Sequence, residues 1–282
     1  EQALDAFLAR GQRVMGRIAA LGVSTVAALS GDTLGGGYEM ALACRHRIAA
    51  DLPRSRIGLP ETQIGIIPGW GGTLRLPRLV GIESGLKFLV TGRTVGPQEA
   101  LQLGMIDEVV PADRLLAAAR RRALDPAPRP AMVDPAAVDP AACSAACERS
   151  RAETRSRSGD HIPAALRVVD VVETSYRDGF AAGCDAERQT LIELRRGPAG
   201  RNLMRLFFLR SGAKKAAARL AGGTPRDVAR AAVIGGGTMG AGIALALARA
   251  GIDVQVVEAD ACDGAAAAAG IAVRLLRPMV EE

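Results

Sequence analysis

Two glutamates in glycine-rich surroundings are the residues of this chain best suited to acid/base chemistry: Glu39 in GDTLGGGYE and Glu61 in RIGLPETQIGIIPGWGG. Glycines precede Glu39, and residues without a Cβ atom let a ligand approach the backbone closely. We expect a helix to begin there, with free N–H groups that could bind an oxygen gaining negative charge. Glu61 follows Pro60 at the predicted end of a short strand, from which its side chain could point into a pocket.

The separation of the two glutamates leaves their pairing open. They are too far apart to share one helix face, so only a helix–strand–strand return of the chain could bring them together. The alternative is structural: Glu39 would be an acid that stabilises a helix N-terminus, and Glu61 a turn residue. The residues alone do not decide between these interpretations.

A second glycine-rich turn lies near the C-terminus, where Gly235-x-Gly237-x-x-Gly240 follows an apolar strand and precedes an alanine-rich helix. Another predicted strand then ends at Glu258. This order is typical of dinucleotide binding, since the glycines admit the pyrophosphate and the acid can bind the ribose 2′-hydroxyl. An acid at that position favours NAD over NADP, while FAD or a purely structural turn remains an alternative.

The elements that would position these residues alternate between short strands and helices, which is typical of parallel crossovers. Helices are predicted over 1–21, 38–44, 72–79, 83–90, 97–104, 161–196 and 201–220, and strands over 23–29, 47–51, 57–59, 105–110, 231–234 and 253–257. A proline-rich stretch, 125–140, is predicted to be an extended connector.

Composition excludes several classes of protein. No apolar run is long enough to span a bilayer, and no secretory signal is visible. The net charge of +6 comes mostly from arginines that lack interleaved aromatic residues, so we expect no nucleic-acid partner and a solvated basic surface. The five cysteines form no C-x-x-C pair and the chain has two histidines, so we expect no metal site.

The segment from Val23 to Pro111 resembles the enoyl-CoA hydratase/isomerase (crotonase) superfamily. It is most similar to bifunctional fatty-acid-oxidation enzymes, in which a hydratase domain precedes a 3-hydroxyacyl-CoA dehydrogenase domain. A weaker resemblance covers 161–220, and a second strong one begins at Ala231, with GGGTMGAGIA followed by VVEAD.

The resemblance implies roles for individual residues. The backbone N–H of Gly36 would polarise the thioester carbonyl, Glu39 would activate water for attack at the β carbon, and Glu61 would deliver a proton to the α carbon. Trp70 stands in a pocket loop where many relatives carry a smaller residue. In the second region the resemblance selects NAD, held by Gly235, Gly237, Thr238, Met239, Gly240 and Glu258.

The resemblance also implies an α/β fold: a crotonase-like β/α spiral core with C-terminal helices, a linker helix and the first β-α-β of a Rossmann domain. We predict a hydratase domain over 1–198, a linker helix over 199–227 and the start of an NAD-binding domain over 228–282. The chain is expected to begin and end inside domains. A second oxyanion donor and most contacts to the CoA adenine would come from upstream, and the dehydrogenase histidine from downstream.

The predicted activity is hydration of trans-2-enoyl-CoA to 3-hydroxyacyl-CoA, with NAD-dependent oxidation to 3-ketoacyl-CoA in the complete protein. The alternatives are a Δ3-Δ2-enoyl-CoA isomerase or a non-catalytic acyl-CoA- or nucleotide-binding chain. The resemblance implies an acyl-CoA substrate and allows a thiolase subunit as partner. It also implies a cytoplasmic protein in a bacterium, and a mitochondrial or peroxisomal one in a eukaryote.

Overall fold

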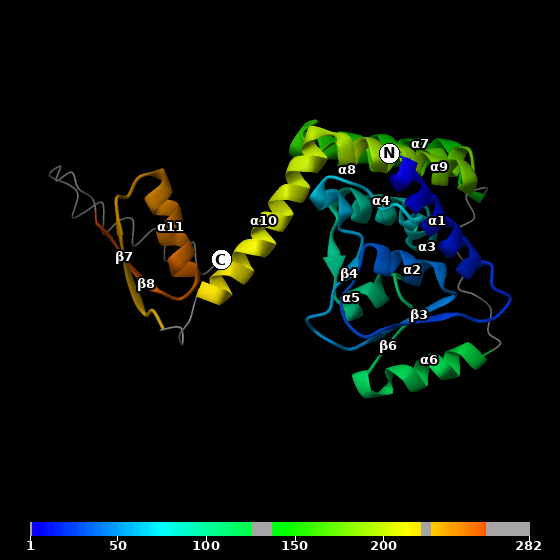
Figure 1. The fold of residues 1–282 in the computed structure, drawn as a ribbon, viewed down its shortest axis with the longest axis horizontal. Coiled ribbons are helices and arrows are strands. Elements are labelled where there is room, and N and C mark those ends of the chain that lie inside the picture. The colour runs from blue at the N-terminus through cyan, green and yellow to red at the C-terminus, as the bar shows by residue number, and fades with distance from the viewer. Residues whose placement is uncertain (1, 126–136, 221–226, 258–282) are drawn as a thin grey trace. The chain divides into compact units, whose positions relative to one another are not determined.

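Two small three-stranded sheets form the centre of the first unit of the chain, Glu1–Gly212 (Figure 1). The computed structural model describes residues 2–125, 137–220 and 227–257. One sheet has the order β1-β3-β6 and is parallel throughout, and the other has the order β2-β4-β5. In the second sheet β4 pairs with β2 in parallel and with β5 antiparallel. The strands are β1 (Val26–Leu29), β2 (Thr33–Leu34), β3 (His46–Ala50), β4 (Ile57–Gly58), β5 (Thr94–Val95) and β6 (Glu108–Val110).

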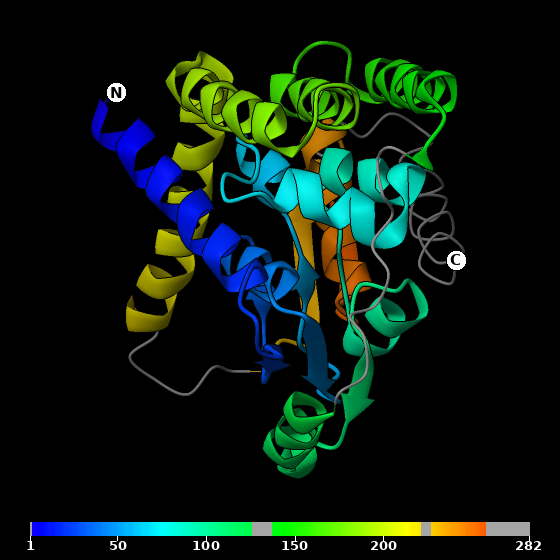
Figure 2. The same ribbon diagram turned by 90° about the vertical axis from the view of Figure 1, so that its right-hand side faces the viewer.

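Helices surround these sheets on several sides. In both views α7, α8 and α9 lie at the top of the unit and α6 at the bottom, with the strands between them (Figures 1 and 2). The α-helices are α1 (Gln2–Ala19), α2 (Gly36–Ala43), α3 (Gly72–Val80), α4 (Ile82–Thr91), α5 (Pro97–Gln102), α6 (Leu115–Leu124), α7 (Pro140–Ser158), α8 (Pro163–Arg177), α9 (Phe180–Arg196) and α10 (Pro198–Leu220). The described residues also include the 3-10 helices η1 (Glu61–Ile64) and η2 (Ala112–Arg114).

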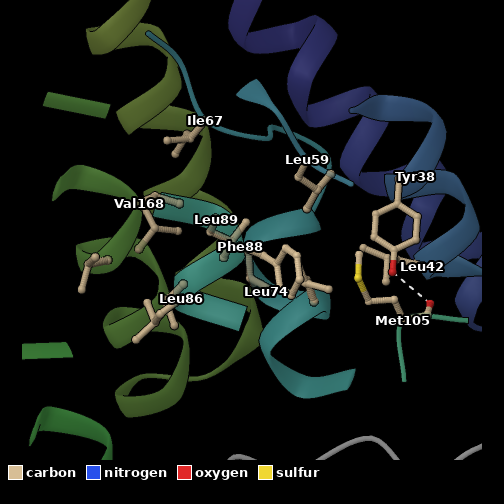
Figure 3. Packing of buried hydrophobic residues seen from close by; sticks show 14 of the residues in the cluster. Tyr38, Leu42, Leu59, Ile67, Leu74, Leu86, Phe88, Leu89, Met105 and Val168 are labelled. Atoms are coloured by element: carbon tan, nitrogen blue, oxygen red, sulfur yellow. Dashed lines mark hydrogen bonds between the residues drawn. The ribbon is translucent and has the colours of Figure 1, made fainter. Parts of the chain in front are cut away.

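The main core lies where α2, α3, α4 and α8 meet (Figure 3). Leu42, Leu74, Leu89 and Val168 are almost completely buried there, which removes their apolar surface from water. The hydroxyl of Tyr38 donates a hydrogen bond of 2.9 Å to the carbonyl oxygen of Met105. Because Tyr38 precedes Glu39 in α2, this buried bond and the surrounding core fix the orientation of the helix that carries the first glutamate.

The second unit, Ala213–Glu282, contains a β-α-β arrangement in its described part. Strand β7 (Arg230–Ile234) pairs in parallel with β8 (Asp253–Val257), and α11 (Thr238–Arg249) connects them. Glu258 lies outside the described residues.

Several predictions about elements were wrong in detail. Glu61 is not at a strand end but is the first residue of η1, because β4 already ends at Gly58. The stretch 161–196 contains two helices that separate at Asp178–Gly179, where Gly179 has a positive φ of 91°.

Helix α7 was not predicted. The side chain of Asp139 accepts a hydrogen bond from the N–H of Ala141 and Pro140 occupies the first turn, so this helix begins inside the expected connector. Residues 126–136 of that connector lie outside the described part of the chain.

Candidate active site and dinucleotide turn

Glu39 lies in the first turn of α2 and is 3% exposed. The helix begins after Gly35, whose φ of 55° suits a residue without a Cβ atom. The Oε1 atom of Glu39 accepts hydrogen bonds from the backbone N–H of Trp70 (2.7 Å) and of Gly72 (2.8 Å). The carboxylate therefore caps the N-terminus of α3, where N–H groups have no partner within the helix.

Glu61 lies against the same helix start, on the side of Gly35. A Cβ atom added at Gly35 would be only 2.7 Å from Oε1 of Glu61. The other oxygen, Oε2, is buried and has no hydrogen-bond partner among the described residues. The structure thus brings the two predicted glutamates together around the first turn of α2.

The electrostatic surroundings of the two carboxyl groups differ. Burial and then the charge of Glu39 raise the pKa of Glu61 from 4.5 to about 8. Burial also raises the pKa of Glu39, but the N–H groups of Gly72 and Trp70 and the charge of Arg75 oppose that rise. The pKa is therefore raised at both carboxyl groups, and Glu39 has hydrogen-bond donors and a nearby cation that oppose the rise.

Gly36 provides the backbone N–H predicted to hold the developing oxyanion. It is the first residue of α2, and N–H groups of a first helical turn have no intrahelical acceptor. The indole of Trp70 packs over it, since a Cβ added at Gly36 would lie 2.8 Å from a carbon of that ring. The N–H and both carboxyl groups therefore belong to one helix start.

The dinucleotide turn differs from the two-glutamate site because its shape depends on backbone conformation and not on side chains. Gly235 has a φ of 94°, and its N–H donates to the carbonyl oxygen of Val257, which ties the turn to β8. A Cβ added at Gly240 would lie 1.7 Å from the carbonyl oxygen of Gly235, so only glycine fits there. Gly237 caps α11, and Thr238 and Met239 are its first residues. A phosphate group fits such a turn, where first-turn N–H groups and the positive end of the helix dipole converge.

Comparison with known proteins matches two regions of the chain to two families. The sequence model of the family described as "Enoyl-CoA hydratase/isomerase" matches residues 5–136. Residues 5–136 belong to the enoyl-CoA hydratase/isomerase family. The model described as "3-hydroxyacyl-CoA dehydrogenase, NAD binding domain" matches residues 230–279, so the chain joins parts of both families.

Solved structures give further similarities. An enoyl-CoA hydratase from Geobacillus kaustophilus HTA426 is 28% identical, with 73% of this chain and 66% of that chain covered and a TM-score of 0.40. An enoyl-CoA hydratase from Bacillus anthracis is 26% identical over 76% of this chain and 69% of that chain, with a TM-score of 0.42. Human mitochondrial delta3-delta2-enoyl-CoA isomerase is 23% identical over 75% of this chain and 70% of that chain; its TM-score of 0.50 reflects the shared crotonase-like fold. The chain spans slightly less than two thirds of the length of the Geobacillus hydratase.

A third buried carboxyl group, near those of Glu39 and Glu61, was missed by sequence reasoning. Glu187 of α9 is completely buried and accepts hydrogen bonds from the backbone N–H of Gly71 (2.7 Å) and of Thr73 (3.3 Å). The amide of Gln12 in α1 donates to the same carboxylate at 3.1 Å. A signal was available, because Glu187 shares the buried face of α9 with Gly183, Thr190, Leu191 and Leu194.

Trp70 fills the space between α1 and α2 in the first unit. Its ring centroid lies 5.6 Å from that of Phe7, and a Cβ added at Gly11 would lie 2.1 Å from the indole nitrogen. The bulky residue in the pocket loop is thus accommodated by glycines on both neighbouring helices.

None of the helices in the described residues is long and apolar enough to cross a membrane.

Proposed function

We propose that the complete protein hydrates trans-2-enoyl-CoA thioesters and oxidises the resulting 3-hydroxyacyl-CoA with NAD. The observation that supports hydration is the contrast between the two carboxyl groups at the start of α2. Glu39 accepts two N–H hydrogen bonds, whereas Oε2 of Glu61 has no hydrogen-bond partner in the part of the chain that is described. An ionised base and a protonated acid side by side are what addition of water across a polarised double bond requires.

In the proposed reaction Glu39 takes a proton from water, and the water oxygen bonds to the β carbon. The π electrons of the double bond move toward the thioester carbonyl, whose oxygen accepts a hydrogen bond from Gly36 N–H. Such a donor contributes about 3–4 kcal/mol to transition-state stabilisation. Glu61 then delivers its proton to the α carbon, and the proton on Glu39 returns to Glu61 through solvent.

The second activity rests on the dinucleotide turn. Gly235, Gly237 and Gly240 leave room for a pyrophosphate, and Thr238 and Met239 begin the helix whose N–H groups would bind it. We assign the ribose hydroxyls to Glu258, which lies outside the described residues. NAD, when bound, supplies the hydride acceptor. The 3-ketoacyl-CoA product is a thiolase substrate, and association with a thiolase subunit stays a prediction.

The test is hydration of crotonyl-CoA by the full-length protein, which is monitored through the loss of enoyl absorbance. Glu39→Gln and Glu61→Gln should each lower kcat by about 10²- to 10⁴-fold, the usual contribution of a general acid or base. Glu83→Gln, at a side chain that is 74% exposed, should leave the rate unchanged. Wild-type rates in both active-site variants would refute the proposal.

Isomerisation of a 3-enoyl-CoA is the competing activity, because proton transfer by carboxyl groups suffices for it. Incubation with a 3-enoyl-CoA, followed by chromatography of the products, distinguishes the isomerase activity from the hydratase activity. Accumulation of 2-enoyl-CoA without 3-hydroxyacyl-CoA would identify an isomerase, and 3-hydroxyacyl-CoA made from 2-enoyl-CoA would identify a hydratase.

A further inference from the structure

We infer that Glu187 is a positioning residue for Glu39, acting through the backbone segment Trp70–Thr73 that both carboxylates bind. This inference rests on the proposed function, because it assigns to Glu187 an effect on the hydration step. Glu187 lies 148 positions after Glu39 in the sequence and on a different helix.

The four N–H groups of the segment Trp70–Thr73 are divided alternately between the two carboxylates. Those of Trp70 and Gly72 donate to Glu39, at 2.7 and 2.8 Å. Those of Gly71 and Thr73 donate to Glu187, at 2.7 and 3.3 Å. The hydroxyl of Thr73 makes a further, short hydrogen bond to Oε2 of Glu187. Glu39 and Glu187 therefore both bind the start of α3, each through alternate N–H groups.

This arrangement makes the position of Glu39 depend on Glu187. The N–H groups at the start of α3 have no partner within the helix, and a buried donor left without an acceptor is strongly unfavourable. If the Glu187 carboxylate is lost, the N–H groups of Gly71 and Thr73 must move to find acceptors. Trp70 and Gly72 alternate with these residues, so the donors of Glu39 would move as well.

The fit around Glu39 leaves little room for such a movement. A Cβ added at Gly72 would lie 2.9 Å from Cγ and 3.0 Å from Oε1 of Glu39, so backbone and carboxylate are in close contact. Gln12 in turn fixes Glu187, because its amide donates to Oε1 of Glu187 and to the carbonyl oxygen of Cys184. The hydrogen bonds thus run from α1 through α9 and the start of α3 to Glu39.

The charged and titratable groups around Glu187 come from each neighbouring element: Glu39 from α2, Glu61 from η1, Arg75 from α3 and Cys184 from α9. Burial and then the charge of Glu39 raise the pKa of Glu187 to about 8. In its ionised form Glu187 adds, by repulsion, to the burial and the Glu39 charge that raise the pKa of Glu61. A neutral residue at position 187 removes that repulsion, and Glu61 then loses its proton at lower pH. The alkaline limb of the pH–rate profile should shift to lower pH.

The experiment measures kcat, KM and the pH–rate profile for crotonyl-CoA hydration by the full-length protein carrying Glu187→Gln. We expect kcat to fall by up to about 10²-fold, the effect of a small displacement of a catalytic group, with KM little changed. The alkaline limb should move to lower pH. Glu193→Gln on the same helix, at a side chain that is 63% exposed, is the matched control and should leave all three quantities unchanged.

A second pair of variants covers the case in which Glu187→Gln does not fold. Thr73→Val removes the hydroxyl donor and keeps the side-chain shape, so it should lower kcat, whereas Thr73→Ser should restore it. A wild-type kcat and pH profile in Glu187→Gln would overturn the inference. If Glu187→Gln does not fold, a wild-type kcat and pH profile in Thr73→Val would overturn it. Wild-type activity in Glu39→Gln would instead overturn the proposed function, so the two failures are distinguishable.

Discussion

Two helices of this chain begin after a glycine-rich turn, yet the surroundings of the two turns differ. At the start of α2 the carboxyl groups of Glu39 and Glu61 are buried against the backbone. At the start of α11 the described side chains are exposed, with Ile234 at 83% and Met239 at 79%. The first turn is surrounded by side chains from distant segments, and the second exposes the backbone that we propose as the surface for a ligand. The same local motif can therefore serve acid/base chemistry or phosphate binding, depending on which side chains the rest of the fold brings to it.

The largest effect is expected from a variant that disrupts the dinucleotide turn and leaves the site of Glu39 and Glu61, the carboxyl site, intact. Gly240→Ala places a methyl group where only 1.7 Å separates it from the carbonyl oxygen of Gly235, so the turn cannot keep its shape. Calorimetric titration with NADH should show binding abolished, with crotonyl-CoA hydration retained. Gly242→Ala, on the same helix and with no atom within 4 Å of the added Cβ, is the control. Tight NADH binding by Gly240→Ala would exclude the turn as the binding site.

The converse variant, Gly72→Ala, should damage the carboxyl site and leave NADH binding intact. Its Cβ would lie 2.9 Å from Cγ of Glu39 and 3.0 Å from the side chain of Leu59, so Glu39 must move. We expect kcat for hydration to fall by about 10²-fold. Gly31→Ala, where an added Cβ has no neighbour within 4 Å, should behave like the wild type. Unchanged kcat in Gly72→Ala would show that this contact does not position the base.

The carboxyl site should also give the free energy of unfolding a pH dependence that the backbone turn lacks. The pKa of Glu61 is raised from 4.5 to about 8 in the folded state, so the fold holds this proton more tightly than the unfolded chain. That contribution is fully present below about pH 4.5 and is lost as the pH rises to about 8. The slope is at most about 1.4 kcal/mol per pH unit.

Urea denaturation at a series of pH values measures this dependence. Glu61→Gln should flatten the curve in that range, while the exposed control Glu83→Gln should keep the wild-type slope. An identical slope in wild type and Glu61→Gln would show that Glu61 is not a protonated carboxyl group in the folded protein.

The smallest expected effect concerns the packing that holds Trp70 beside the site. Gly11→Ala would place a Cβ 2.1 Å from the indole nitrogen, and overpacking of this kind destabilises a protein by about 1–3 kcal/mol. Gly16→Ala, on the same helix with open space around the added Cβ, should instead stabilise by up to about 1 kcal/mol. Equal free energies of unfolding for the two variants would contradict the described contact between α1 and Trp70.

The sequence by itself determined the features that depend on neighbouring residues. The glycine run predicted the start of α2, and Gly235, Gly237 and Gly240 predicted the β-α-β arrangement, because short-range backbone geometry requires those residues. It also indicated both families, which the family matches confirm for residues 5–136 and 230–279.

Only the tertiary structure decided which side chains meet. Glu39 and Glu61 converge because β2 pairs with β4, which sets the chain before α2 beside the chain before η1. Glu187 joins them because α9 packs against α3, whereas the sequence marks it only as a member of the buried face of a helix. A carboxyl group acquires a raised pKa from burial and from its neighbours, and both are products of packing between residues far apart in the chain.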